Sequence, residues 1–320
     1  MPDDLDRAQP AMIDNVDRRL LEILRGDPRI SNRAIAQALG LSETTIGVRL
    51  ERLSVNNIAR VIAQRDVRAM GWRISGHCDV FLKDVDPEEV LARVNAHPNV
   101  ITIYRLAGPP ELMVKIVASD LDELARIALD MIGSDRGVRR VDLQICLGHG
   151  HTRAGFGNLE SPRPARADLE GDLQAQIMEI LARDGRISNR EISRMLGVAE
   201  ATIRARLRVL QQNNMLRYIL VCNPERVGYT SLAFMRMRLP SPEIDGFMAS
   251  IAQNPNIFGA TRLTGEHNLG VAIYAADWPN AWELCSQISR WSPRIEDPVI
   301  RPAISFARHR YDMAFIAAPD

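Results

Sequence analysis

The chain has 320 residues, of which 46% are hydrophobic and 25% charged, and its formal net charge is zero. This composition excludes a fibrous or disordered protein, and the balanced charge excludes one that coats nucleic acid by bulk electrostatics alone. No run approaches about 18 uninterrupted apolar residues, and the N-terminal MPDDLDRAQP is too polar for a signal peptide. We therefore expect a cytoplasmic protein with no membrane partner.

The chain contains an internal repeat. The segment that begins ISNRAIAQALGLSETTIGVRL aligns without a gap with the segment that begins ISNREISRMLGVAEATIRARL. The spacing that relates Ser31 to Ser188 also relates residues far downstream, such as Gly108 and Gly265. A register that persists through turns as well as helices indicates a tandem duplication of one unit.

The first half of each unit is predicted to form three short helices. Apolar residues recur at helical spacing before Ser31 and before Ser188, which stand where a second helix needs an N-cap. Gly40 and Gly197 stand where that helix must end, and a further helical pattern follows each glycine directly. This arrangement is typical of a helix-turn-helix, whose third helix enters the DNA major groove.

The third helix of each unit offers the candidate DNA contacts, because helical geometry turns them outward when Ile46, Leu50 and Leu53 face inward. The candidates are Ser42, Thr44, Thr45, Val48, Arg49 and Arg52 in the first copy, and Thr202, Arg204, Ala205, Arg206 and Arg208 in the second. Hydroxyl and methyl groups can meet base edges, and arginine can meet phosphate or guanine. We expect the more arginine-rich second copy to bind DNA more strongly, with a steeper salt dependence. Alternatively, these helices serve only packing.

The second half of each unit has a different periodicity. After Gly71 the apolar pattern changes from helical to alternating, and the segments follow in the order strand, helix, strand, strand, helix, strand. This βαββαβ order predicts a ferredoxin-like α+β domain, and the second copy repeats it. Helices cover only one face of such a sheet, so we expect two of these domains to pair, either within the chain or between chains.

The expected organisation is a tandem α+β chain with two winged helix-turn-helix domains and two ferredoxin-like sensor and assembly domains. The bounds are 12–65 and 66–147 in the first unit, a linker at 148–167 rich in Gly, Pro and Arg, and 168–222 and 223–310 in the second unit. The strand after each third helix is a candidate wing. The cysteines form no Cys-x-x-Cys pair, and His149 with His151 lacks a third ligand, so neither a metal nor a cofactor is expected.

The order of elements resembles that of the Lrp/AsnC (feast/famine) transcription regulators, in a tandem form. The segments SNRAIAQALGLSETTIGVRLERL and HPNVITIYRLAGPPELMVKIV, with their second copies, carry the resemblance. It implies self-association through the sensor domains and an effector, an amino acid or a similar metabolite, bound between them. It also implies that the turn after the second sensor strand contributes to the effector site: Gly108 and Glu111 in the first copy, and Gly265, Glu266, His267 and Asn268 in the second.

Two features depart from the family pattern. Glu111 replaces the usual aspartate and follows two prolines, which remove two amide donors, and Asn268 is uncharged. Both departures argue against an amino acid as the effector at these turns.

The resulting prediction is a sequence-specific DNA-binding transcription regulator that a small metabolite modulates, and not an enzyme. Two alternatives remain open. A minority of proteins similar to this family are sirohaem-type haem-precursor decarboxylases, in which His267 with Arg262 or Arg105 could act at the sensor interface. The other alternative is a metabolite-binding assembly that does not bind DNA. No Ser-His-Asp spacing, Walker loop, H-E-x-x-H or dinucleotide fingerprint supports another catalyst.

Overall fold

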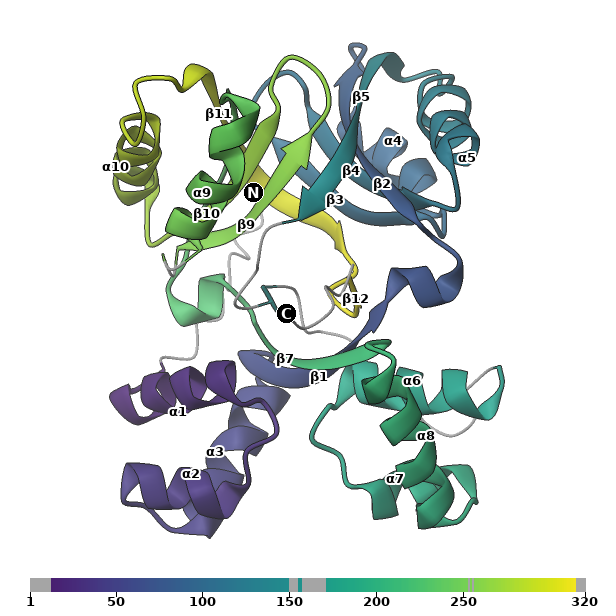
Figure 1. The fold of residues 1–320 in the computed structure, drawn as a ribbon, viewed down its shortest axis with the longest axis vertical. Helices are drawn as coiled ribbons and strands as arrows, with labels where there is room; N and C mark the ends of the chain where they lie inside the picture. Colours follow the sequence, from purple (N-terminus) through teal and green to yellow (C-terminus); the bar gives the residue numbers. More distant parts are fainter. Residues whose placement is uncertain (1–12, 150–154, 157–170, 253, 255, 315–320) are drawn as a thin grey trace, which may run out of the picture.

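The computed structural model describes residues 13–149, 155–156, 171–252, 254 and 256–314. Two helical domains lie side by side at one end of the molecule, a curved ribbon of strands crosses them, and a β-barrel with outer helices forms the other end (Figure 1). Both copies of the repeat contribute to each layer. The chain is therefore an intramolecular pseudo-dimer.

Each unit begins with three short helices, which are α1 (Asn15–Gly26), α2 (Asn32–Leu39) and α3 (Glu43–Val55), then α6 (Leu173–Arg183), α7 (Asn189–Leu196) and α8 (Glu200–Gln212). The side chains of Ser31 and Ser188 cap α2 and α7 by accepting a backbone amide of the first turn. Gly40 and Gly197 end these helices in the left-handed conformation, with φ of 68° and 69°. The helix-turn-helix prediction is confirmed in both copies.

The third helices of the two units begin differently. Ser42 accepts a hydrogen bond from the amide of Thr45 at 3.0 Å, whereas Ala199 leaves α8 without a side-chain cap. We expect Ala199→Ser to raise the free energy of unfolding by about 1 kcal/mol, because the new hydroxyl satisfies an exposed amide. Ser42→Ala should lower it by a similar amount. Urea denaturation of the full chain measures both, and changes of the same sign would contradict the capping argument.

The two strands that were candidate wings pair with each other instead. β1 (Ala59–Asp66) and β7 (Leu216–Cys222) run antiparallel, and β12 (Met313–Ala314) and β6 (Gly155–Phe156) flank them on either side. A lone strand needs a partner for its backbone groups, and each unit supplies one such strand after its third helix. The ribbon therefore connects the two helical domains directly.

The second half of each unit follows the predicted βαββαβ order. The first copy contains β2 (Ile74–Leu82), α4 (Pro87–Asn95), β3 (Val100–Leu106), β4 (Leu112–Ala118), α5 (Leu121–Ala125) and β5 (Val138–His149); the second contains β8 (Ser231–Arg238), α9 (Ser241–Ile251), β9 (Ile257–Leu263), β10 (Leu269–Ala275), α10 (Trp278–Ser289) and β11 (Glu296–His309). The eight strands close into one barrel in the order β10-β8-β11-β3-β4-β2-β5-β9. Pairing of β11 with β3, and of β5 with β9, leaves neither sheet with an open edge.

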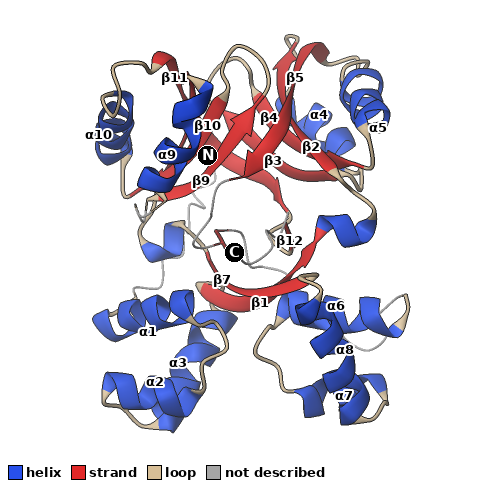
Figure 2. Cartoon of the chain, in the orientation of Figure 1, coloured by secondary structure: helices blue, strands red, loops and turns tan. Residues whose placement is uncertain are grey.

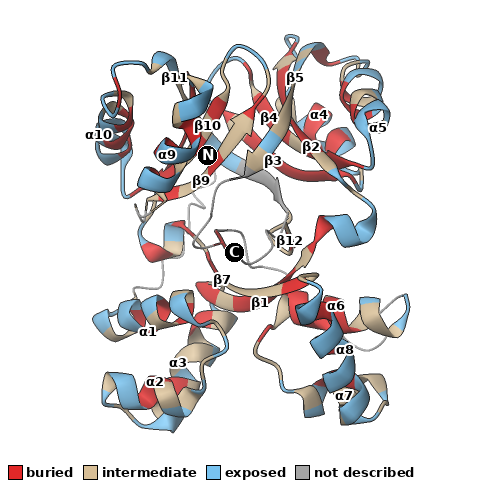
Figure 3. Cartoon of the chain, in the orientation of Figure 1, coloured by how far each residue is buried: buried red, intermediate tan, exposed pale blue. Residues whose placement is uncertain are grey.

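The helices cover the outside of the barrel (Figure 2), and each sheet buries an apolar core beneath its own helices (Figure 3). Val114 and Ile116 of β4, for example, are fully buried in the core of the first copy. Side chains alternate along a strand, so the residue between them, Lys115, points to the opposite face, into the barrel. The interior of the barrel is shared by the two copies.

Candidate nucleic-acid interface

The third helices α3 and α8 present the predicted outward residues. Ile46 and Leu53 of α3, and Ile203, Leu207 and Leu210 of α8, are buried, which fixes the opposite face toward solvent. The candidates that lie exposed are Ser42, Thr44 and Val48 on the first helix and Thr202, Arg204, Ala205, Arg206 and Arg208 on the second. Thr45, Arg49 and Arg52 are half-buried. The two faces therefore differ in how their arginines are held.

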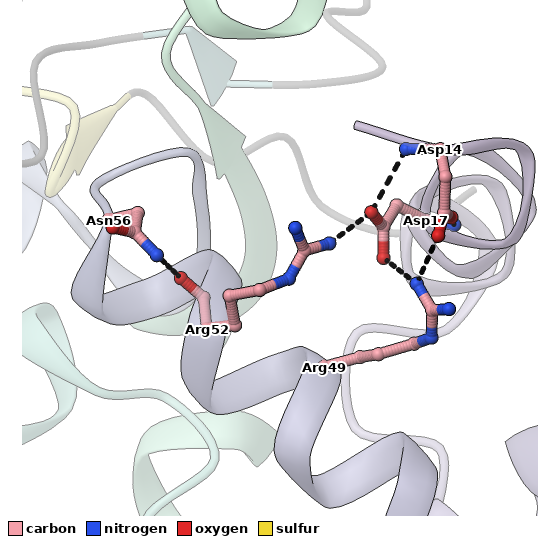
Figure 4. Close-up of polar contacts among 5 residues, drawn as sticks. All are labelled: Asp14, Asp17, Arg49, Arg52 and Asn56. Carbon is pink, nitrogen blue, oxygen red and sulfur yellow. Dashed lines mark hydrogen bonds and ion pairs between the residues drawn. The ribbon is translucent and has the colours of Figure 1, made fainter. Parts of the chain in front are cut away.

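The two arginines of α3 bind carboxylates at the start of α1 (Figure 4). Arg49 Nη1 lies 2.7 Å from Asp14 Oδ2 and 2.8 Å from Asp17 Oδ1, and Arg52 Nη2 donates to the other oxygen of Asp17. Asp17 is fully buried. The hydrogen bond to Asp14 does most to raise the pKa of Arg49, and the backbone amide of Asp17 does most to lower the pKa of Asp14. These arginines hold α3 against α1.

The arginines of α8 have no such acidic partners. By the register of the repeat, Gly171 and Gln174 stand where the first copy has Asp14 and Asp17. Arg206 and Arg208 are exposed and form no hydrogen bond or ion pair with another described residue. Arg204 pairs with Glu200 one turn away, at 2.8 Å, but both side chains are solvent-exposed, and such a pair is weak. The second helix therefore presents an uncompensated positive face.

From the sequence, Arg49 and Arg52 are candidate DNA contacts like the arginines of α8, whereas in the structure they bind the carboxylates of α1. The sequence held a sign of this difference: Asp14 and Asp17 stand three residues apart at the start of the first helix. This pair of aspartates has no counterpart in the second copy. The helical pattern did not place those aspartates beside α3, because that contact depends on how the helices cross.

The predicted effector turns make the same contact in the two copies. Glu111 Oε2 accepts the amide of Leu82 at 2.9 Å, and Asn268 Oδ1 accepts the amide of Leu239 at 3.0 Å. Asn268 also donates to the carbonyl oxygen of Leu239. Glutamate and asparagine thus both fasten the turn to the end of the neighbouring strand.

The other predicted residues of these turns are two glycines, Glu266 and His267. Gly108 and Gly265 each have φ of 99°, in the left-handed region, as a tight turn requires. Glu266 is exposed, and His267 Nε2 lies 3.0 Å from the carbonyl oxygen of Asp297.

The residues of the enzymatic alternative are each engaged elsewhere. Arg105 binds Glu88 at 2.6 Å, and Arg262 binds Asp245 at 3.0 Å. These are equivalent ion pairs between a strand and a helix in each copy. Among the described residues there is no group of three or more His, Cys, Asp or Glu placed to hold a metal ion, and no described helix could cross a membrane.

Comparison with known proteins assigns the domains. Residues 13–54 and 172–211 each match the AsnC-type helix-turn-helix domain, and residues 78–149 match the Lrp/AsnC ligand binding domain. The HTH-type transcriptional regulator FL11 of Pyrococcus furiosus is 30% identical over 137 residues, which are 42% of this chain and 90% of that protein. The HTH-type transcriptional regulator AldR of Mycolicibacterium smegmatis is 26% identical over 141 residues, 43% of this chain and 82% of its own.

Solved structures of a siroheme decarboxylase resemble nearly the whole chain. The siroheme decarboxylase NirDL superposes with a TM-score of 0.62 at 18% identity, covering 92% of this chain and 93% of that one. At that identity the likeness shows a shared fold, including the succession of two units. The sequence matches to the helix-turn-helix and ligand binding domains, and to FL11, show that the chain belongs to the Lrp/AsnC family.

Proposed function

We propose that this protein is a sequence-specific DNA-binding transcription regulator whose second recognition helix supplies most of the electrostatic hold on DNA. The exposed and uncompensated Arg206 and Arg208 of α8 carry this proposal. Guanidinium groups in that setting suit phosphate and guanine. On α3, Ser42, Thr44 and Val48 remain to contact base edges. The β1–β7 ribbon holds both helices on one side of the molecule, where they can enter successive major grooves.

We also propose that the sensor turns contribute to an effector site, and that the pseudo-dimer associates further through its sensor domains, in the cytoplasm. In the turns, Gly108 and Glu111 face one effector, and Gly265, Glu266, His267 and Asn268 face another. The backbone hydrogen bonds of Glu111 and Asn268 support a fixed turn geometry, on which such a site depends. Because one turn is acidic and the other bears a neutral amide, the two should differ in ligand preference.

Quantitative binding to the promoter region next to the protein's own gene tests the regulator proposal. Fluorescence anisotropy with a labelled duplex from that region should give an affinity at least about a thousandfold tighter than a scrambled duplex of equal length. Equal affinity for both duplexes would show that the protein binds DNA without sequence specificity, which would contradict the proposal. No binding to either would favour the metabolite-binding assembly.

We propose that the protein is not a decarboxylase. The enzymatic alternative needs His267 beside Arg262 or Arg105, whereas both arginines are engaged with carboxylates of their own copy. Absorbance spectra of the purified protein mixed with sirohaem test this: a shifted Soret band with stoichiometric binding would support the enzymatic alternative.

A further inference from the structure

A cavity of about 220 Å³ lies between the interior of the barrel and the β1–β7 ribbon. Strands of both copies line it, with Lys115 of β4 and Tyr104 of β3 from the first copy, and Phe234 of β8 and Phe258 of β9 from the second. Arg217 of β7 closes it on the side of the ribbon. Its lining includes none of the residues Gly108, Glu111, Gly265, Glu266, His267 or Asn268 of the turns after β3 and β9, so it is distinct from those turns.

The charged side chains that line this cavity are all basic. His77, Lys115, Arg217, Arg236 and Arg310 all line it, and none of the described lining residues is acidic. Arg236 and Arg310 have their own carboxylates, Asp79 and Asp312. Of the four lysine and arginine side chains, the other two, Lys115 and Arg217, are not neutralised by these pairs.

Lys115 and Arg217 carry that excess charge. Arg217 Nε donates to the uncharged Oε1 of Gln64 at 2.8 Å. Lys115 makes no hydrogen bond or ion pair with any residue that the structure describes. Burial lowers the pKa of both groups, because a charge away from water is less well solvated. An anion bound between them would remove that penalty.

The repeat shows that the cavity is asymmetric. Positions His77 and Lys115 of the first copy correspond to Phe234 and Ala272 of the second, and all four line the cavity. At these two positions the first copy therefore supplies ionisable side chains and the second copy apolar ones. The rings of Tyr104 and Phe234, which both line the cavity, meet edge to face at 4.6 Å between centroids.

We infer that this cavity is a further small-molecule site and that it takes a small aromatic carboxylate, with the carboxylate at Lys115 and the ring against Phe234 and Tyr104. The size agrees, because an apolar cavity of roughly 150 Å³ accommodates benzene, and the present cavity adds room for a short acidic side chain. One negative charge on the ligand offsets that of Lys115, which has no hydrogen bond or ion pair with a described residue, while Arg217 keeps its hydrogen bond to Gln64.

Isothermal titration calorimetry of the full chain without DNA tests the inference with defined probes. Phenylacetate and benzoate supply ring and charge, phenylacetamide supplies the ring alone, and inorganic phosphate supplies charge alone. We expect saturable binding of at least one of the two carboxylates, about tenfold or more tighter than the amide, because a charge-assisted bond is worth roughly 1.5–3 kcal/mol, or tenfold and more. Phosphate should bind more weakly still.

Lys115→Met should weaken carboxylate binding by about tenfold or more. The matched control is Lys83→Met, because Lys83 is the other lysine of the chain, is exposed, and donates to the carbonyl of Arg136 at 2.9 Å. That variant should bind like the wild type. Lys115→Met should also keep or raise the melting temperature, because it removes a poorly solvated charge.

A second variant separates loss of the site from loss of the fold. Ala272→Leu fills the cavity from β10 of the second copy and should abolish binding while Lys115 remains. The inference is overturned if neither carboxylate binds, if phenylacetamide or phosphate binds as tightly as the better carboxylate, or if Lys115→Met binds it unchanged.

Discussion

Asp79→Asn is expected to lower the free energy of unfolding by about 3–5 kcal/mol, because it leaves a buried guanidinium without its counter-ion. Arg236 donates from both Nη atoms to the two oxygens of Asp79, at 2.6 and 2.7 Å, and each side chain is 4% exposed. Arg301 adds a third contact at 2.5 Å. Burial lowers the pKa of Arg236 and the charge of Asp79 opposes that shift, so the pair depends on both partners.

The position of this pair explains why the two copies face each other. By the register of the repeat, Asp79 on β2 and Arg236 on β8 are equivalent residues. They meet inside the barrel. If two first copies paired instead, two aspartates would face each other, and two second copies would bring two arginines together, which is costly in a buried setting. The charge pair therefore favours association between unlike copies, which a single chain provides.

Urea or guanidinium denaturation of the full chain measures the effect. Asp142→Asn is the control, because Asp142 forms an exposed pair with Arg140 at 3.0 Å, and it should change stability by less than about 0.5 kcal/mol. The double variant Asp79→Leu with Arg236→Met should recover most of the loss, since neither buried charge remains. A loss below about 1 kcal/mol for Asp79→Asn would show that the pair does not secure the barrel.

Local signals in the sequence predicted the elements well. The caps Ser31 and Ser188, the glycines that follow and the change of periodicity after Gly71 are all short-range features, and they were sufficient for the two helix-turn-helix domains and the βαββαβ order. The βαββαβ order, in which helices cover only one face of the sheet, predicted that the two sensor sheets could pair.

The features that needed the structure depend on contacts between distant segments. The sequences of β1 and β7 are each typical of a wing strand, and neither indicates that the two strands pair with each other. Arg49 looks like a DNA contact until α1 is placed beside α3. Lys115 is one alternating polar residue in a strand, and its role depends on which residues the second copy places opposite it.

Arg49→Ala and Arg206→Ala are the same change at equivalent positions of the repeat, and we expect opposite results. Arg206→Ala should weaken DNA binding about tenfold with little change in stability, because the side chain is exposed and without a protein partner among the described residues. Arg49→Ala should lower the free energy of unfolding by about 1.5–3 kcal/mol, because it removes a charged partner from the buried Asp17. Its effect on DNA affinity should be several-fold at most.

Salt dependence distinguishes contact with phosphate from a change in the fold. Each arginine that neutralises a phosphate contributes about one unit to the slope of log affinity against log salt. Arg206→Ala with Arg208→Ala should therefore reduce that slope by about two and the affinity by about a hundredfold, whereas Arg49→Ala should leave the slope unchanged. Anisotropy titrations at several salt concentrations, below the melting temperature of each variant, give these values. An equal loss of slope at Arg49 and Arg206 would mean that the aspartates of α1 release Arg49 on binding, and that both heads hold DNA alike.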